Sequence, residues 1–240
     1  MKNQIKNRGF QFYHIIYLIM LFLLIFGSIS FAADKKEGLK KGDVTVDGLT
    51  VMESTRFTET QVKKGVVWSE YTKYQITPVE VSFRDNWKRD YNREQKNLSM
   101  RVTDEDMIRI KETVAKIVYE EFDKALQKEG GLTKVDQPDT NTLIFTPRVI
   151  KLDVYAPEVE NGPVLSHALV RQAGKATLFL EVHDAVSGEL LARWVDTRED
   201  PDRGYFEWAN RITNAERVRQ IVFGWARRLI EGLDKLKAVN

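Results

Sequence analysis

The sequence predicts an α+β fold: a two-layer sandwich in which two long helices lie on one face of a mostly antiparallel sheet of about four to five strands. Two stretches, 103–128 and 213–236, repeat apolar residues at the three- and four-residue spacing of amphipathic helices. Between them, residues 174–198 alternate apolar and polar side chains on both sides of a Ser-Gly turn, which indicates a β-hairpin. This element order favours helices packed on one face of a sheet.

The strands are expected to begin near residue 66. Residues 66–83 are rich in strand formers, but Pro78 lies among them. Because proline cannot donate to a β-ladder, Pro78 indicates an edge position or the start of a strand. Phe83, Trp87 and Tyr91 follow one another at four-residue intervals, which places the three rings on one face of a short helix.

The clearest helix is predicted over residues 103–128. Thr103 can accept a hydrogen bond at its start, and Asp106 occupies the reciprocal position of a capping box. Gly130 and Gly131 provide the stop. The apolar face is expected to consist of Met107, Ile110, Val114, Ile117, Val118, Phe122 and Ala125.

A strand is predicted over 142–154, again with a proline, Pro147, inside it. The hairpin at 174–198 follows, and then an irregular loop from residue 199 to residue 211. Thr213 and Glu216 form a full capping-box pattern that predicts the start of the second long helix. Its apolar stripe is expected to consist of Val218, Ile221, Val222, Trp225, Leu229, Leu233 and Leu236.

The N-terminal 33 residues have the pattern of a secretory signal. Lys2, Lys6 and Arg8 precede an apolar run over 15–26, and small residues at Ser30 and Ala32 follow, as at a cleavage site. An uncleaved N-terminal anchor is the alternative, since the apolar stretch to residue 33 is nearly long enough to span a bilayer. In both cases the rest of the chain is expected to be exported, to the periplasm or the outer side of the inner membrane. Residues 34–65 are interpreted as a flexible arm, with an ordered edge strand as the alternative, and 66–240 as one α+β envelope domain.

The composition excludes several function classes. The chain has 37 Lys and Arg against 35 Asp and Glu, and three of the basic residues but none of the acidic ones precede Asp34. The remainder is therefore nearly neutral, which argues against a nucleic-acid partner. There is no cysteine, which excludes disulfides, thiolate metal sites and cysteine nucleophiles. The G-x-S-x-G, P-loop and G-x-G-x-x-G motifs are also absent, so neither catalytic residues nor a cofactor is predicted.

Three segments of the hairpin resemble a family of bacterial envelope lipoproteins, domain of unknown function 3313. They are Gly174–Ala176, Asp184–Ala192 and Asp196–Arg198. The resemblance extends from about Val66 to the C-terminus and implies a periplasm-facing domain without an established enzyme activity. Family members usually carry a lipobox cysteine, which this chain lacks. The other matching residues are Tyr71, Tyr74, Ile76, Pro78 and Val79 in the opening strand and Trp225, Ala226 and Leu229 in the closing helix.

Polar residues of the hairpin are candidates for a ligand site. His183, Asp184, Asp196 and Arg198 could form a pocket in which Arg198 grips a carboxylate or phosphate. The alternative is structural: Asp184 caps the turn, while Asp196 and Arg198 hold the hairpin in register. Glu181 and His183 could share a metal ion, but two ligands without a third do not make a site, so no metal is predicted.

Two surfaces are candidates for partner binding. Tyr205, Phe206 and Trp208 lie on the predicted loop before the second helix, where aromatic residues suit a protein partner. The alternative is that they seal the gap between hairpin and helix. The basic aromatic segment 84–93 could touch anionic lipid, or could be an amphipathic cover on the sheet.

The function predicted from these features is an exported, non-catalytic envelope protein that binds another envelope component. The alternative is a small-ligand binder or enzyme with a polar site beside the 174–198 hairpin. Nothing in the sequence indicates the oligomeric state.

Overall fold

The computed structural model describes the chain from Leu39 onward, with few internal gaps. The described residues are 39–53, 56–157, 159, 168–170, 172–202, 204, 207–209 and 211–239.

The described residues form ten strands, three α-helices and two 3₁₀ turns. The strands are β1 (Thr50–Val51), β2 (Glu59–Val62), β3 (Lys73–Ile76), β4 (Glu80–Phe83), β5 (Thr133–Lys134), β6 (Thr142–Val154), β7 (Ala168–Val170), β8 (Gly174–Asp184), β9 (Leu190–Glu199) and β10 (Glu207–Ala209). The helices are α2 (Trp87–Glu94), α3 (Asp104–Lys128) and α4 (Arg211–Val239), and the turns are η1 (Trp68–Glu70) and η2 (Leu98–Met100).

The sheet is larger and more mixed than the sequence predicts. Eight strands pair in the order β1-β2-β9-β8-β6-β3-β5, with β4 also paired to β6, and β7 and β10 form a separate two-stranded sheet. The predicted sandwich of four to five mostly antiparallel strands is therefore wrong, although the fold is α+β. β3 and β4 pair with β6 in parallel, and β5 pairs with β3 in parallel. These pairings join segments far apart in sequence, and neither periodicity nor turn residues encode them.

The pairing register explains how β6 tolerates Pro147, although β6 is not an edge strand. Ala185 donates its backbone N–H to the Thr142 carbonyl of β6 at 3.1 Å. In an antiparallel ladder the bonded pairs alternate, so Pro147 and Leu180 face each other as a non-bonded pair. The nitrogen of Pro147 therefore points away from β8, toward the interval between β3 and β4 that contains Pro78. No ladder donor is lost there, because the neighbouring chain has left the sheet.

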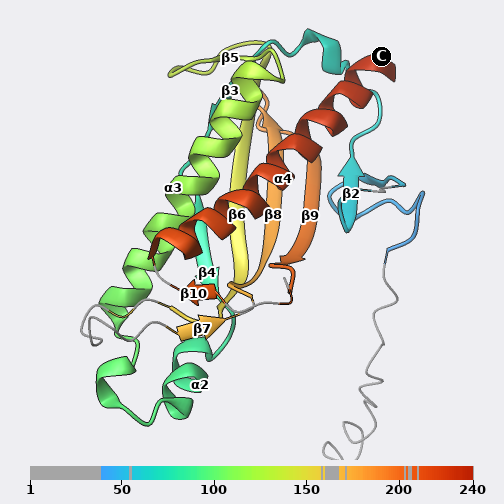
Figure 1. The fold of residues 1–240 in the computed structure, drawn as a ribbon. Helices are drawn as coiled ribbons and strands as arrows, with labels where there is room; N and C mark the ends of the chain where they lie inside the picture. The colour runs from blue at the N-terminus through green and yellow to red at the C-terminus, as the bar shows by residue number, and fades with distance from the viewer. Residues whose placement is uncertain are drawn as a thin grey trace, which may run out of the picture. The chain divides into compact units, whose positions relative to one another are not determined.

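Helices α3 and α4 lie on one face of the sheet, as predicted, and run across β6, β8 and β9 (Figure 1). The capping box of α3 is confirmed: the Thr103 side chain accepts from the Asp106 N–H while the Asp106 carboxylate accepts from the Thr103 N–H. Helix α4 begins at Arg211, two residues before the predicted cap at Thr213. None of the helices in the described part of the chain combines the length and apolar character needed to cross a membrane.

The N-terminal segment of the described chain contributes to the sheet. β2 pairs with β9, and β1 forms the outer edge of the sheet. Leu49, Phe57 and Val62 are buried. At the opposite end of the fold, Trp87 of α2 is buried, stacks on Phe83 at 4.2 Å, and donates its indole N–H to the Val154 carbonyl. This is the behaviour of an amphipathic cover.

Candidate functional site

A cavity of about 450 Å³ lies between the first turns of α3, the first turns of α4 and the adjoining ends of β6 and β8. This volume is within the usual range of small-molecule sites. The cavity is open to solvent on one side, so a small molecule could reach it without a change in the fold. Its apolar walls offer water few hydrogen bonds.

Small residues and a bulge create the cavity. Ala173, Gly174 and Ala176 line it from β8 and the residue before it, and Ala215 lines it from α4. The β6–β8 register shifts between Ile150 and Asp153, where Lys151 has a φ of 53°. A bulge of this kind bends the strand and redirects the following side chains. Leu152, within the bulge, and Val154, beyond it, line the cavity.

Gly174 is the point of closest approach between the two strands at the cavity wall. Its φ is +156°, and a Cβ placed on it would lie 2.2 Å from the Asp153 carbonyl oxygen. Only glycine allows β8 to start this close to β6.

The inner end of the cavity is apolar. Val114, Val149, Val222 and Trp225 line it and are at most 5 % exposed. The indole N–H of Trp225, the one polar group among these side chains, donates to Asp196 Oδ2 at 3.0 Å. The hydrogen-bonding capacity of Trp225 is thus satisfied by the protein.

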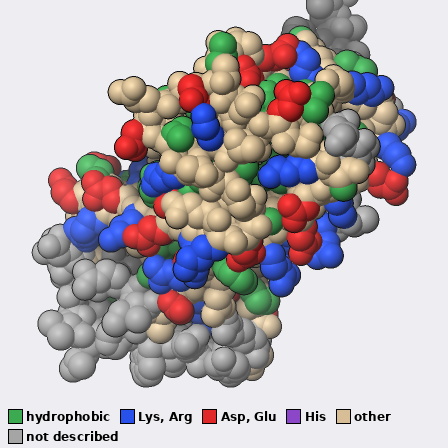
Figure 2. Space-filling model, turned by 90° about the horizontal axis from the view of Figure 1, so that it is seen from above, with side chains coloured by type: hydrophobic (Ala, Val, Ile, Leu, Met, Phe, Trp, Pro, Cys, Tyr) green, Lys and Arg blue, Asp and Glu red, His purple; other side chains and the backbone are tan. Residues whose placement is uncertain are grey.

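The outer end of the cavity carries charges of both signs. Arg109 and Glu112 extend from α3, and Asp153 and Lys175 come from β6 and β8. Asp153 accepts from Arg84 at 2.9 Å, and Arg109 is paired with the buried Asp106. Basic and acidic side chains are likewise interspersed on the face of the molecule seen in Figure 2. The rim is therefore polar without a dominant sign.

The four predicted ligand-site residues do not come together. His183 lies on the sheet face opposite the helices, whereas Asp196 is on the helix side, opposite Leu178 of β8. Their positions along β8 differ by five residues, or roughly 16 Å. Asp184 caps the turn, accepting from the N–H groups of Val186 and Ser187, as its structural interpretation predicts.

Asp196 links three parts of the chain. It is 1 % exposed and accepts hydrogen bonds from the Thr58 N–H (3.1 Å) and hydroxyl (3.0 Å), from Arg198 Nε (2.6 Å) and from Trp225. Arg228 lies 3.7 Å away, and burial lowers the pKa of its guanidinium, an effect to which Arg198 adds. Asp196 and Arg198 thus anchor β9 to α4 and to the segment before β2, and neither lines the cavity.

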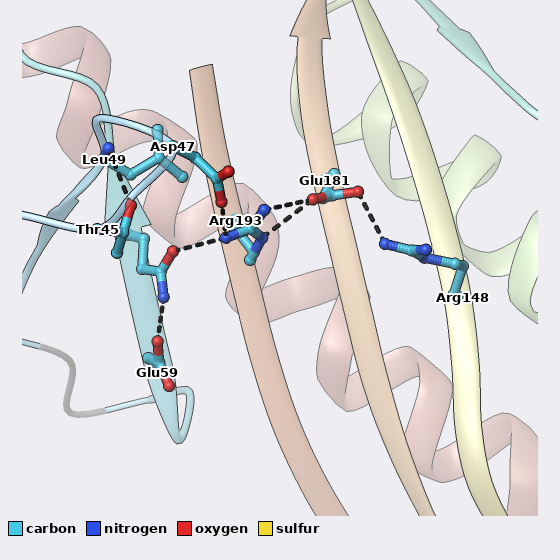
Figure 3. Close-up of polar contacts among 8 residues, drawn as sticks. Thr45, Asp47, Leu49, Glu59, Arg148, Glu181 and Arg193 are labelled. Carbon is cyan, nitrogen blue, oxygen red and sulfur yellow. Dashed lines mark hydrogen bonds and ion pairs between the residues drawn. The ribbon is translucent and has the colours of Figure 1, made fainter. Parts of the chain in front are cut away.

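An ionic network occupies the sheet face opposite the helices, here called the open face. Glu181 of β8 accepts from Arg148 at 2.8 Å and from Arg193 at 2.7 Å, and Asp47 of the N-terminal segment pairs with Arg193 at 2.8 Å (Figure 3). The guanidinium carbon of Arg148 lies 4.5 Å from the centre of the Phe179 ring. Glu181, a candidate metal ligand with His183, is therefore held by two arginines. No group of three or more acidic or histidine residues that could hold a metal occurs in the described ranges.

The partner-binding candidates are only partly described. Tyr205 and Phe206 lie outside the described residues, and Trp208 is in β10, opposite Leu169 of β7. In the basic aromatic segment, Arg84 pairs with Asp90 at 2.9 Å and Lys88 with Asp104 at 2.7 Å.

A comparison with protein families identifies the family of the chain. The model of the family described as Protein of unknown function (DUF3313) matches residues 47–229, which include the cavity and both faces of the sheet. The chain belongs to this family. No curated protein matches the DUF3313 chain in a sequence comparison.

Comparison with solved structures gives weak similarities. A PelC dodecamer from Paraburkholderia phytofirmans matches at 7 % identity, with 69 % of this chain and 94 % of the PelC chain covered and a TM-score of 0.33. A PDZ domain protein from Parabacteroides distasonis matches at 13 % identity, with 68 % of this chain and 33 % of that chain covered and a TM-score of 0.34. At these scores the matches do not define the fold of the DUF3313 chain.

Sequence reasoning missed the cavity. The lining residues of this DUF3313 chain appear in the sequence as ordinary members of apolar stripes, since periodicity reports which side chains are buried and not whether they fill the space. The available signal was side-chain size: Ala173, Gly174 and Ala176 are three small residues among four at the start of the hairpin.

Proposed function

We propose that the protein is an exported, non-catalytic binding module of the bacterial cell envelope, and that the cavity holds the apolar part of another envelope component. The observation that carries this proposal is the cavity itself, which has an apolar, buried inner end and a charged rim. Transfer of an apolar group from water to such a site is favourable by about 25 cal/mol per Å² buried. The sequence pattern of residues 1–33, which predicts an export signal, supports the envelope as the place of action.

The test is native mass spectrometry of the protein taken from gently disrupted envelopes, with the N-terminus sequenced in the same sample. We expect a start near Ala33 or an intact N-terminal anchor, and an added mass that dissociates as a small molecule. Recovery of the protein only from the cytoplasm would overturn the export. Recovery from the envelope with no added mass, together with no binding of an apolar dye to the purified protein, would overturn the cavity as a binding site.

A second candidate function is capture of an envelope protein through residues 205–208. The observation that favours it is that β10, which contains Trp208, pairs with β7 in a two-stranded sheet separate from the eight-stranded one. Replacing Tyr205, Phe206 and Trp208 by Ala should leave the circular dichroism spectrum unchanged and remove the partner in crosslinking from intact envelopes. Retained crosslinking by the folded triple variant would contradict this role of the segment.

A further inference from the structure

We infer that the ligand of the cavity is a single-chain amphiphile, which enters with its hydrocarbon chain first and leaves its head group at the rim. This inference rests on the proposed function and names its substrate class. It follows from three features of the cavity: its length, the direction in which its polarity changes, and the mixed charge of its rim.

The cavity extends along the first turns of both helices. Its α3 wall runs from Asp106 to Val114 and its α4 wall from Asn214 to Trp225, or about 12 and 16 Å at 1.5 Å per helical residue. We call the space of about 450 Å³ between these walls and the strands its bore. A hydrocarbon chain laid along the two walls fits the length of the bore.

Polarity decreases from the rim inward. Lys175 and Glu112 at the rim are exposed, whereas Val149 and Trp225 at the inner end are each 1 % exposed. Because the Trp225 N–H is already bonded to Asp196, a head group carried to the inner end would lose its water and find no replacement. The hydrocarbon chain of the ligand must therefore enter the cavity first.

The rim selects weakly among head groups. Arg109 and Lys175 could attract an anion, but Glu112 and Asp153 stand beside them, and the charges of Arg109 and Asp153 are already paired with Asp106 and Arg84. Exposed pairs of this kind contribute little net attraction. Affinity should therefore depend on the length of the chain much more than on the charge of the head.

The experiment is displacement of anilinonaphthalene sulfonate from lipid-extracted protein by octanoate, decanoate, dodecanoate and hexadecanoate, all below their micelle concentrations. The expected affinity rises about fourfold for each added methylene until the chain fills the cavity, and then levels off. Dodecanol should bind within about tenfold of dodecanoate. Quenching of tryptophan fluorescence by a brominated chain should be reduced in Trp225→Phe, which reports how far the chain enters.

Two variants narrow the bore, and one serves as a control. Ala176→Leu and Ala215→Leu place a larger side chain in the cavity and should each lower the affinity for dodecanoate at least tenfold while leaving the protein folded. Ala115→Leu makes the same change on α3 at a position that does not line the cavity, and should leave the affinity unchanged.

The outcomes separate the ligand class from the function. Displacement of the dye by naphthalene but not by any of the chains would overturn the single-chain ligand and leave the proposed cavity function standing. Equal affinity for all chain lengths, or unchanged affinity in both bore variants, would also overturn it. Failure of the dye, the chains and naphthalene to bind at all would overturn the proposed function as well.

Discussion

Toward the C-terminal ends of α3 and α4 the space between helices and sheet is filled by large side chains, whereas toward their N-terminal ends it contains the cavity. In the filled end, Phe122, Leu126, Trp194 and Leu229 are each at most 1 % exposed. In the hollow end, the residues that face this space from β8 and α4 include the small side chains of Gly174, Ala176 and Ala215. The same two helices and the same sheet thus do two different things: the filled end stabilises the fold, and the hollow end leaves room for a ligand.

The largest expected effect comes from emptying the filled end. Phe122→Ala should lower the free energy of unfolding by about 3–5 kcal/mol, because the surrounding side chains cannot close the space. Ile110→Ala, at the wall of the cavity, should cost less than about 2 kcal/mol, since Ile110 is only partly buried and already borders open space. Urea unfolding of both variants measures the difference. Equal losses would mean that the two ends do not differ in this way.

The next effect concerns Asp196, which anchors β9 to α4 and bonds the tryptophan at the inner end of the cavity. Asp196→Ala should destabilise the fold by about 3 kcal/mol, because it leaves the buried Trp225 N–H without its acceptor and the Arg228 guanidinium without the carboxylate that lies 3.7 Å from it. Asp196→Asn is the matched control and should cost less, since its side-chain oxygen still accepts one hydrogen bond. If Asp196→Ala alters neither stability nor the fluorescence of Trp225, then Asp196 does not hold this ring.

A third prediction tests the wall of the hollow end. Gly174→Ala should lower stability by about 1–3 kcal/mol, because its backbone conformation is one that only glycine adopts easily and its Cβ would meet the Asp153 carbonyl. Gly188→Ala, at a turn with open space around it, is the control and should cost only about 1 kcal/mol for its positive φ. The larger loss expected for Gly174→Ala comes from the close approach of β6 and β8 at the cavity. Thermal unfolding of the two variants measures the difference in stability.

The smallest effect is a pH dependence at the turn between β8 and β9. Tyr71 donates to Asp184 at 3.0 Å, and burial, with that hydrogen bond, raises the pKa of Tyr71 from 10.0 to about 12. The folded pKa is the higher one, so this contact contributes fully below pH ~10 and is lost as the pH rises to about 12. Since Tyr71 is partly exposed, we expect about 0.5–1 kcal/mol.

Tyr71→Phe should therefore lower stability at neutral pH and remove part of the decline between pH ~10 and ~12. On the acid side, bonds from Ser187 and Tyr71 lower the pKa of Asp184, so its contribution is present above its ordinary pKa and disappears as the pH falls through the lowered one. Urea unfolding measured from acidic to alkaline pH shows both the acid and the alkaline decline in stability. An unchanged alkaline decline in Tyr71→Phe would show that Tyr71 is not its source.

Local patterns were sufficient to predict the local elements. The α3 cap at Thr103 and the β8–β9 hairpin are where their residues indicated. The parallel partners of β6 were not predictable, because the pairing of β3 and β4 with β6 depends on segments some seventy residues apart. The role of the candidate site residues was even harder to predict from the sequence. Asp196 and Arg198 have the chemistry of a ligand clamp, and only the tertiary contacts of Asp196 with Thr58 and Trp225 reveal an anchoring role.

The contacts of Asp196 also set an order of events for the growing chain. The bond from Thr58 spans 138 positions, and the partner on α4, Trp225, lies close to the C-terminus. Loop closures of this length are slow, and β2, which pairs with β1 early in the chain, cannot join the rest of the sheet until β9 has been synthesised. Completion of the domain must therefore wait until almost the whole chain has been synthesised. Until then, a holding chaperone would find the apolar strands exposed.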